Sequence, residues 1–172
     1  IGNGDIASAI KDRKDLLFFA SGVSNSRETR ESEYRREINL LRKQNRNSHV
    51  VYFSSLCVYY SNTRYARHKR CVERLVKGFR TWTIFRIGNI DWGTNPYTLI
   101  NYLKNRKKKG QKLHIENVYR YVINREEFDY WINLIPPWSC EMNIPGRRMK
   151  VREIVQRFID DYLKCAVFSW QC

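Results

Sequence analysis

The chain has 172 residues, of which 42% are hydrophobic and 32 are lysine or arginine, and its formal net charge is +15 at pH 7. This length and apolar content exclude a disordered chain and are typical of one folded domain with its own core. No apolar run approaches the roughly 20 residues of a membrane-spanning helix, and no signal-peptide pattern opens the sequence. The charge favours an anionic partner, such as a nucleotide, a phosphorylated ligand or a nucleic acid, although solvated helix faces explain it equally well.

The cysteines are odd in number and show neither a Cys-x-x-Cys pair nor the Cys/His spacing of a metal site; they are Cys57, Cys71, Cys140, Cys165 and Cys172. Thiols without such patterns are typical of proteins in the reducing cytoplasm. We therefore expect a cytoplasmic protein with free thiols and no metal centre.

The first residues contain a Gly-x-Gly-x-x-Ala pattern formed by Gly2, Gly4 and Ala7. Such a turn lets the backbone approach a pyrophosphate when it follows a strand and opens a helix. Only Ile1 precedes the pattern here, so either the strand lies outside the sequence or the match is accidental. A short helix is predicted over residues 6–14.

A buried strand is predicted over residues 16–20, and small residues follow it at 21–26. Small residues after a strand suit the close approach of a ligand, but they equally suit an ordinary turn. Residues 28–46 have the period of an amphipathic helix with a strongly charged outer face. Asn39 shares part of the inner side of this helix.

The strongest candidate site follows. An apolar run over 49–55 predicts a strand that ends in Ser54 and Ser55. A helix over about 62–78 then carries Tyr65 and Lys69 one turn apart on the same face. Ligands of open α/β sheets bind at the carboxyl ends of the strands, so these side chains are well placed for a ligand.

The chemistry of these residue types suits proton transfer. An ammonium one turn away lowers the pKa of the Tyr65 phenol, which then serves as an acid or base near neutral pH. Ser55 is placed to hold a hydroxyl or carbonyl oxygen of the substrate. The alternative is that Tyr65 merely packs against the body of the protein, since a lone Tyr-x-x-x-Lys pattern is weak. His68 lies off this face and is predicted at the surface.

The remaining chain continues to alternate strands and helices, which favours a mostly parallel sheet covered by helices. The predicted elements are strands at 82–87, 112–116 and 119–123, and helices from Pro96 to before Gly110, at 125–135 and at 150–163. We expect a core over residues 1–110 and a C-terminal, substrate-side elaboration over residues 111–172.

Taken together, several segments resemble the extended short-chain dehydrogenase/reductases, which include the NAD(P)-dependent sugar-nucleotide epimerases and dehydratases. No single segment is specific, but the set follows the family's order and covers nearly the whole chain. The segments are Gly2-Asn-Gly-Asp-Ile-Ala7, Phe18-Phe-Ala-Ser-Gly22, Tyr52-Phe-Ser-Ser-Leu-Cys-Val-Tyr59, Tyr65-Ala-Arg-His-Lys69, Phe85-Arg-Ile-Gly-Asn-Ile90, Tyr119-Arg-Tyr-Val-Ile123 and Asn143-Ile-Pro-Gly-Arg-Arg-Met-Lys-Val-Arg-Glu-Ile154. The resemblance implies a Rossmann-like, mostly parallel α/β sheet with helices on both faces, here truncated at its first-half strands.

The resemblance also implies roles for individual residues. Tyr65 is expected to be the general acid and base, Ser55 to orient the reacting oxygen, and Lys69 to lower the pKa of Tyr65 and bind the nicotinamide ribose of NAD or NADP. The expected cofactor contacts are Gly2, Gly4, Asp5, Ile6, Ala20, Ser21, Gly22, Asn39 and Lys69, and the expected substrate contacts are Ser24, Asn89 and Arg120. For Arg120, an exposed strand arginine that binds nothing is the alternative.

The chain departs from the family in length. Few residues separate the glycine pattern from the strand at 16–20, where the family has two further strands and their helices. Those strands carry the residue that reads the adenosine ribose, so the sequence does not distinguish NAD from NADP. In a second alignment Gly4-Asp5-Ile6 instead matches the segment that follows the family's third strand. In that alignment the glycine pattern is not a dinucleotide-binding fingerprint. The loop between Ser55 and Tyr65 is also shortened.

Two functions follow. The first is a compact NAD(P)-dependent oxidoreductase or epimerase of carbohydrate biosynthesis that acts on a nucleotide-sugar or a similar anionic substrate. The second is a degraded dehydrogenase fold that binds nucleic acid or a protein through its basic surface. We recognise no aromatic stacking motif on a strand pair and therefore favour the first, partly by analogy of fold. A homodimer paired through the helices at 28–46 and 62–78 is compatible with either function.

Overall fold

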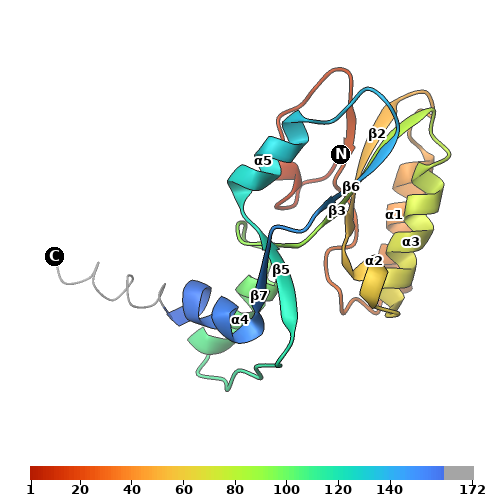
Figure 1. Ribbon diagram of the computed structural model, residues 1–172. Coiled ribbons are helices and arrows are strands. Elements are labelled where there is room, and N and C mark those ends of the chain that lie inside the picture. Colours follow the sequence, from red (N-terminus) through yellow and green to blue (C-terminus); the bar gives the residue numbers. More distant parts are fainter. Residues whose placement is uncertain (161–172) are drawn as a thin grey trace.

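The computed structural model describes residues 1–160, and its main feature is a sheet of four parallel strands (Figure 1). The strands lie in the order β1–β2–β3–β6 and are formed by Leu17–Phe19, His49–Ser55, Thr81–Ile87 and Cys140–Ile144. The predicted α/β class with a Rossmann-like parallel sheet is therefore confirmed. Apolar, β-branched and aromatic residues dominate β2 and β3, which are buried on both faces as central parallel strands require.

Helices cover both faces of this sheet, as expected (Figure 1). Helices α1 (Glu31–Arg42) and α3 (Arg64–Val76) pack on one face, against Phe19, Tyr52 and Ile84. Helix α5 (Arg125–Asn133) and a 3₁₀ turn at Ala7–Ala9 pack on the other, against Phe53 and Phe85. Successive strand residues point to opposite faces, so each strand contributes to both cores.

A second, smaller sheet joins β4 (Asn89–Ile90), β5 (Tyr119–Ile123) and β7 (Arg147–Lys150) in that order. Helix α4 (Leu99–Lys108), helix α6 (Val151–Val155) and a π-helical turn at Gln156–Asp160 share a core with one side of it. Both sheets draw strands from before and after residue 110, and the division of the chain at that residue stays a prediction.

The chain passes from the first sheet to the second at two glycines. A Cβ on Gly88 would lie 2.3 Å from the Pro145 oxygen, and one on Gly146, whose φ is +69°, would lie 2.3 Å from the Val122 oxygen. At both glycines a neighbouring backbone segment lies where a Cβ would be, so only glycine fits there.

Several predicted elements differ from the structure. Residues 112–116 form no strand, and the helix predicted over 6–14 is only the 3₁₀ turn. Helix α2 (Cys57–Tyr60) and strands β4, β6 and β7 were not predicted. These elements are short, and their partners are distant in sequence, so local periodicity carries little signal for them. The last predicted helix is present to residue 160; its end at 163, Cys165 and Cys172 lie outside the described residues.

No helix among the described residues is long and apolar enough to cross a membrane.

Candidate functional site

The residues of the predicted proton-transfer site come from the carboxyl end of β2 and the first turns of α3. Ser55 is the last residue of β2, and its Oγ accepts a hydrogen bond from the Cys57 N–H at 3.3 Å. Thr63 caps α3, and Tyr65 and Lys69 follow one turn apart. The Lys69 Nζ lies 5.6 Å from the centre of the Tyr65 ring. The sequence prediction that these two side chains are neighbours agrees with this geometry.

Lys69 is buried, with only 2% of its surface exposed. Its ammonium donates to the Tyr52 hydroxyl at 3.1 Å and to Glu37 Oε1 at 3.2 Å. Glu37 is fully buried on α1 and also lies against Tyr52, whose hydroxyl donates to it at 2.7 Å. The lysine charge is therefore already balanced by an internal carboxylate.

Two further groups complete this arrangement. His68 Nε2 lies 2.9 Å from Glu37 Oε2, and the Val23 N–H donates to the same oxygen at 2.8 Å. His68 is only 8% exposed, so the prediction that it lies at the surface is wrong. We call Glu37, Tyr52, His68 and Lys69 the inner cluster. Glu37 could not be predicted from the sequence, because one glutamate among the charged residues of an amphipathic helix is typical of its outer face.

Electrostatics fix the charge state of the Glu37 carboxyl. Burial, the largest influence, raises its pKa, but the charge of Lys69 and the hydrogen bonds from His68 and Val23 together outweigh it. The pKa of Glu37 is therefore well below its usual range, and the group is a carboxylate at neutral pH.

The phenol of Tyr65 behaves differently from the expectation. Burial raises the pKa of Tyr65 above that of an ordinary phenol, and Cys57 and Glu37 act in the same direction. The predicted lowering of this pKa by Lys69 is therefore wrong for the protein alone. The physical reason is first of all burial, which disfavours the charged phenolate, and the nearby Cys57 and Glu37 add to it.

Some of the predicted cofactor residues of the first 22 positions are neighbours: Gly2 lies against Ala20 and Ser21, and Gly22 lies beside Lys69. The Ile1 nitrogen donates to the Phe18 oxygen at 2.6 Å, and the Ala20 N–H donates to the Ile1 oxygen at 2.8 Å. This is the pairing of a parallel strand on the free edge of β1, so the glycine pattern leaves the sheet at its carboxyl edge.

Glycine is required where these turns meet. Gly2 has a φ of +128°, and a Cβ on it would lie 2.5 Å from the Ala20 oxygen and 3.1 Å from the Ser21 nitrogen. A Cβ on Gly22 would lie 2.7 Å from Lys69 Nζ. Gly4 has open space around it. The predicted residues Gly2, Ala20, Ser21, Gly22 and Lys69 are thus contiguous, and their contact with a cofactor stays a prediction.

Other predicted cofactor residues have internal partners. The Asp5 carboxylate accepts hydrogen bonds from the backbone N–H groups of Thr94 and Asn95, both at 3.0 Å. Ile6 packs against the core under α5. Asn39 is exposed on α1, so the expectation that it shares the inner side is wrong; the buried polar residue of this helix is Glu37.

The three predicted substrate residues also have partners in the protein. Ser24 Oγ accepts from Asn95 Nδ2 at 2.9 Å, and Asn89 Nδ2 donates to the Tyr121 oxygen at 2.9 Å. Arg120 forms an exposed ion pair with Glu116 at 3.2 Å. Their roles toward a substrate stay predictions.

A second set of buried charges lies next to the inner cluster and was also missed from the sequence. Arg86 on β3 forms two hydrogen bonds to Glu73 on α3, at 3.0 and 2.7 Å, and a third to Glu141 at 2.6 Å. Ser54 Oγ donates to Glu73 at 2.5 Å. These bonds, above all those to Glu73, raise the pKa of Arg86. The pairs tie α3 to β2, β3 and β6 and so hold the helix that carries Tyr65.

No group of three His, Cys, Asp or Glu side chains within residues 1–160 has the geometry of a metal site. Cys57, Cys71 and Cys140 are free thiols.

No family model and no curated protein matches the sequence. Solved structures, in contrast, match the fold. The enzyme WbmG of Bordetella bronchiseptica in complex with NAD is 16% identical, with a TM-score of 0.55 over 66% of this chain and 43% of its own. The UDP-N-acetylglucosamine 4-epimerase of Methanobrevibacter ruminantium M1, in complex with UDP-N-acetylmuramic acid, is 17% identical, with a TM-score of 0.60 over 94% and 64%.

A UDP-galactose 4-epimerase is 15% identical, with a TM-score of 0.63 over 84% of this chain and 61% of its own. The chain thus spans between 43% and 64% of the length of these three structures. At these identities the likeness concerns the fold alone. The described residues have a Rossmann-like fold that is similar to the folds of these three structures.

Proposed function

We propose that the chain is a compact NAD(P)-dependent oxidoreductase or epimerase that acts on a nucleotide-sugar or a similar anionic substrate through Ser55, Tyr65 and Lys69. The observation that supports this most is that Lys69 lies against both Tyr65 and the Gly22 turn, while Ser55 ends β2 at the carboxyl edge of the parallel sheet. Ligands of open α/β sheets bind at this edge.

In this proposal Ser55 and Tyr65 have separate roles in the proton transfer. Ser55 donates a hydrogen bond to the oxygen of the reacting hydroxyl or carbonyl, and Tyr65 takes up or releases the proton at that oxygen. For this the Tyr65 pKa has to fall from its raised value. A shift of the Lys69 ammonium from Glu37 toward the phenol has this effect, because an unpaired positive charge favours phenolate.

The residues present fit a nicotinamide cofactor at the same edge. Gly4 leaves its backbone open to a pyrophosphate, and Gly22 brings the chain within contact of the lysine that would bind the ribose. When bound, the cofactor accepts or supplies a hydride. Asp5 and Ile6 are engaged elsewhere, so we assign the contacts to the glycine turns and Lys69.

One observation favours a second candidate, a dehydrogenase fold that has lost its chemistry. Glu37 balances Lys69, and burial, with Cys57 and Glu37, raises the pKa of Tyr65, which is the opposite of what a resting acid/base site requires. In that case the inner cluster serves stability alone, and the protein works through its surface.

Calorimetric titration with NADH and NADPH separates the two candidates. We expect micromolar binding that is weakened at least tenfold by Lys69→Ala, and the tighter ligand identifies the cofactor. Lys69→Ala removes the ammonium beside the buried Glu37 carboxylate, so circular dichroism has to show that the variant is folded. Tyr65→Phe, which removes no charge, is the matched control and should bind the cofactor but lack turnover. No binding of either nucleotide by folded wild-type protein would exclude the first candidate.

A further inference from the structure

The antiparallel pair β5–β7 presents one face away from the core formed with α4 and α6. The register pairs Tyr119 with Lys150 and Tyr121 with Arg148. On the other face of the pair, Val122 and Met149 are buried in the core. Because side chains alternate along a strand, Tyr119, Tyr121, Arg148 and Lys150 share the opposite face. We call these four residues the outer face.

On the outer face the two tyrosines of β5 lie beside the two cations of β7. The side chain of Tyr119 is 45% exposed, although it is a large ring on a paired strand. The Arg148 guanidinium carbon lies 3.8 Å from the centre of the Tyr119 ring, and Lys150 Nζ lies 5.6 Å from it. The ring thus holds the guanidinium in place while its own remaining surface stays accessible.

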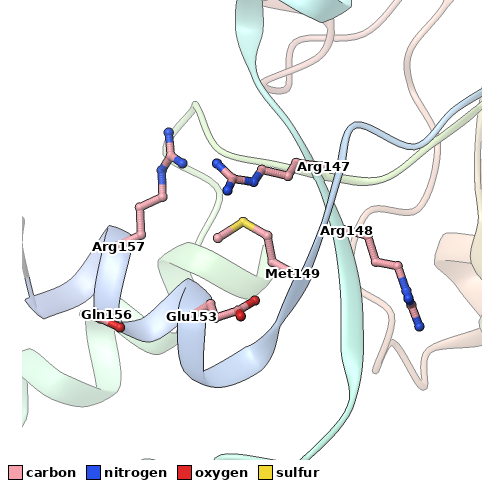
Figure 2. Close-up of a pocket in the computed structure, with 6 residues that line it drawn as sticks. All are labelled: Arg147, Arg148, Met149, Glu153, Gln156 and Arg157. Carbon is pink, nitrogen blue, oxygen red and sulfur yellow. The ribbon is translucent and has the colours of Figure 1, made fainter.

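The cations of the outer face have no carboxylate partner. Within residues 1–160 neither Arg148 nor Lys150 forms an ion pair, whereas the neighbouring Arg120 is paired with Glu116. Figure 2 shows that Arg148 leaves β7 on the side opposite to Arg147 and Arg157, so its charge belongs to the outer face. In a chain with a net charge of +15, these groups attract anions.

We propose that the outer face binds single-stranded nucleic acid. Bases stack on Tyr119 and Tyr121, and phosphates contact Arg148 and Lys150. Aromatic rings beside cations on an exposed strand pair are the elements of single-strand recognition, because every base has a face that stacks. A duplex hides those faces, and an acidic protein makes no use of them, so the combination favours single strands over both. The proposal does not depend on turnover at Ser55, Tyr65 and Lys69.

Fluorescence anisotropy with labelled 20-mers of uridine and deoxythymidine tests this proposal. We expect micromolar binding at 50 mM salt that weakens steeply by 200 mM salt, because phosphate contacts release counterions. Tyr119→Ala should weaken binding about fivefold or more with an unchanged salt slope, since it removes a stacking partner. Arg148→Gln should weaken binding and reduce the salt slope by about one. The difference between the two 20-mers shows whether RNA or DNA is preferred.

The controls decide whether the face or the overall charge is responsible. Lys108→Gln removes an exposed charge on α4 and should leave binding within about twofold of wild type. A duplex of the same length and polyglutamate should both bind more weakly than the single strands. The proposal is overturned if no binding occurs at 50 mM salt, if Tyr119→Ala has no effect, if Lys108→Gln weakens binding as much as Arg148→Gln, or if duplex or polyglutamate binds equally well.

Discussion

The inner cluster and the outer face use the same kinds of side chain in opposite ways. Both combine tyrosine with cationic groups, but in the inner cluster Lys69 is 2% exposed and bonded to a fully buried carboxylate. On the outer face the tyrosine is exposed and the cations lack a carboxylate within the described chain. A buried charge has to be paired within the protein, whereas an exposed one can stay available to a ligand.

The two regions are therefore expected to differ in whether ligand binding disturbs the fold. The inner cluster joins α1, α3 and β2 through Glu37, Lys69 and Tyr52, so any ligand that recruits Lys69 has to break an existing ion pair. The outer face requires no such rearrangement. We expect a ligand to bind the outer face weakly and without breaking an existing contact. Binding at the inner cluster is expected to change the stability of the fold.

The largest effect is expected from Glu37→Gln, which keeps the shape of the side chain but leaves the Lys69 charge buried and unpaired. Loss of one partner of a buried ion pair costs about 3–5 kcal/mol of unfolding free energy. Urea denaturation at pH 7 measures it. The matched control is Arg148→Gln on the outer face, where loss of an exposed cation–π contact costs about 1 kcal/mol or less.

The double variant Glu37→Gln/Lys69→Met keeps this prediction testable if the single variant does not fold. Removing both charges leaves no unpaired ion, so much of the stability should return. Equal stability losses for Glu37→Gln and Arg148→Gln would contradict the distinction between the two regions.

Acid is expected to lower the free energy of unfolding through Glu37, by less than the Glu37→Gln substitution does. The pKa of Glu37 is lowered in the folded protein, so its contribution to stability is full above the ordinary glutamate pKa of about 4.3 and is lost as the pH falls below it. Below that pH the unfolded chain binds a proton at Glu37 while the folded protein still holds the carboxylate, so the difference in unfolding free energy between wild type and Glu37→Gln should narrow between pH 6 and pH 3. Urea titrations at several pH values measure this difference. If this difference stayed constant across the pH range, protonation of Glu37 would not be coupled to unfolding.

Local sequence patterns were sufficient for the main sheet and its helices. Strands β2 and β5 have the predicted bounds, because long apolar or aromatic runs between polar turns specify buried strands. The Tyr65–Lys69 spacing is equally local, since a helix fixes which side chains share a face.

The inner cluster and the outer face depend instead on contacts between distant segments. Glu37 lies 32 residues before Lys69, and nothing in α1 alone distinguishes it from its exposed neighbours. The outer face was missed because β7 reads Arg-Arg-Met-Lys, which has no strand signal of its own. Only its pairing with β5 places Arg148 over Tyr119, so the sequence showed no aromatic motif on a strand pair.

The smallest effect is expected from two glycines of the cofactor edge. A Cβ on Gly22 would meet Lys69 Nζ at 2.7 Å and Glu37 Oε1 at 2.9 Å, whereas a Cβ on Gly4 would meet nothing within 4 Å. Gly22→Ala should therefore force the buried ion pair apart and cost about 1–3 kcal/mol. Gly4→Ala should stay within about 0.5 kcal/mol, as expected of an exposed site. Thermal and urea unfolding of both variants measure the contrast. If Gly22→Ala were as stable as Gly4→Ala, the Lys69 ammonium would have room to move, and its release toward Tyr65 would need no ligand.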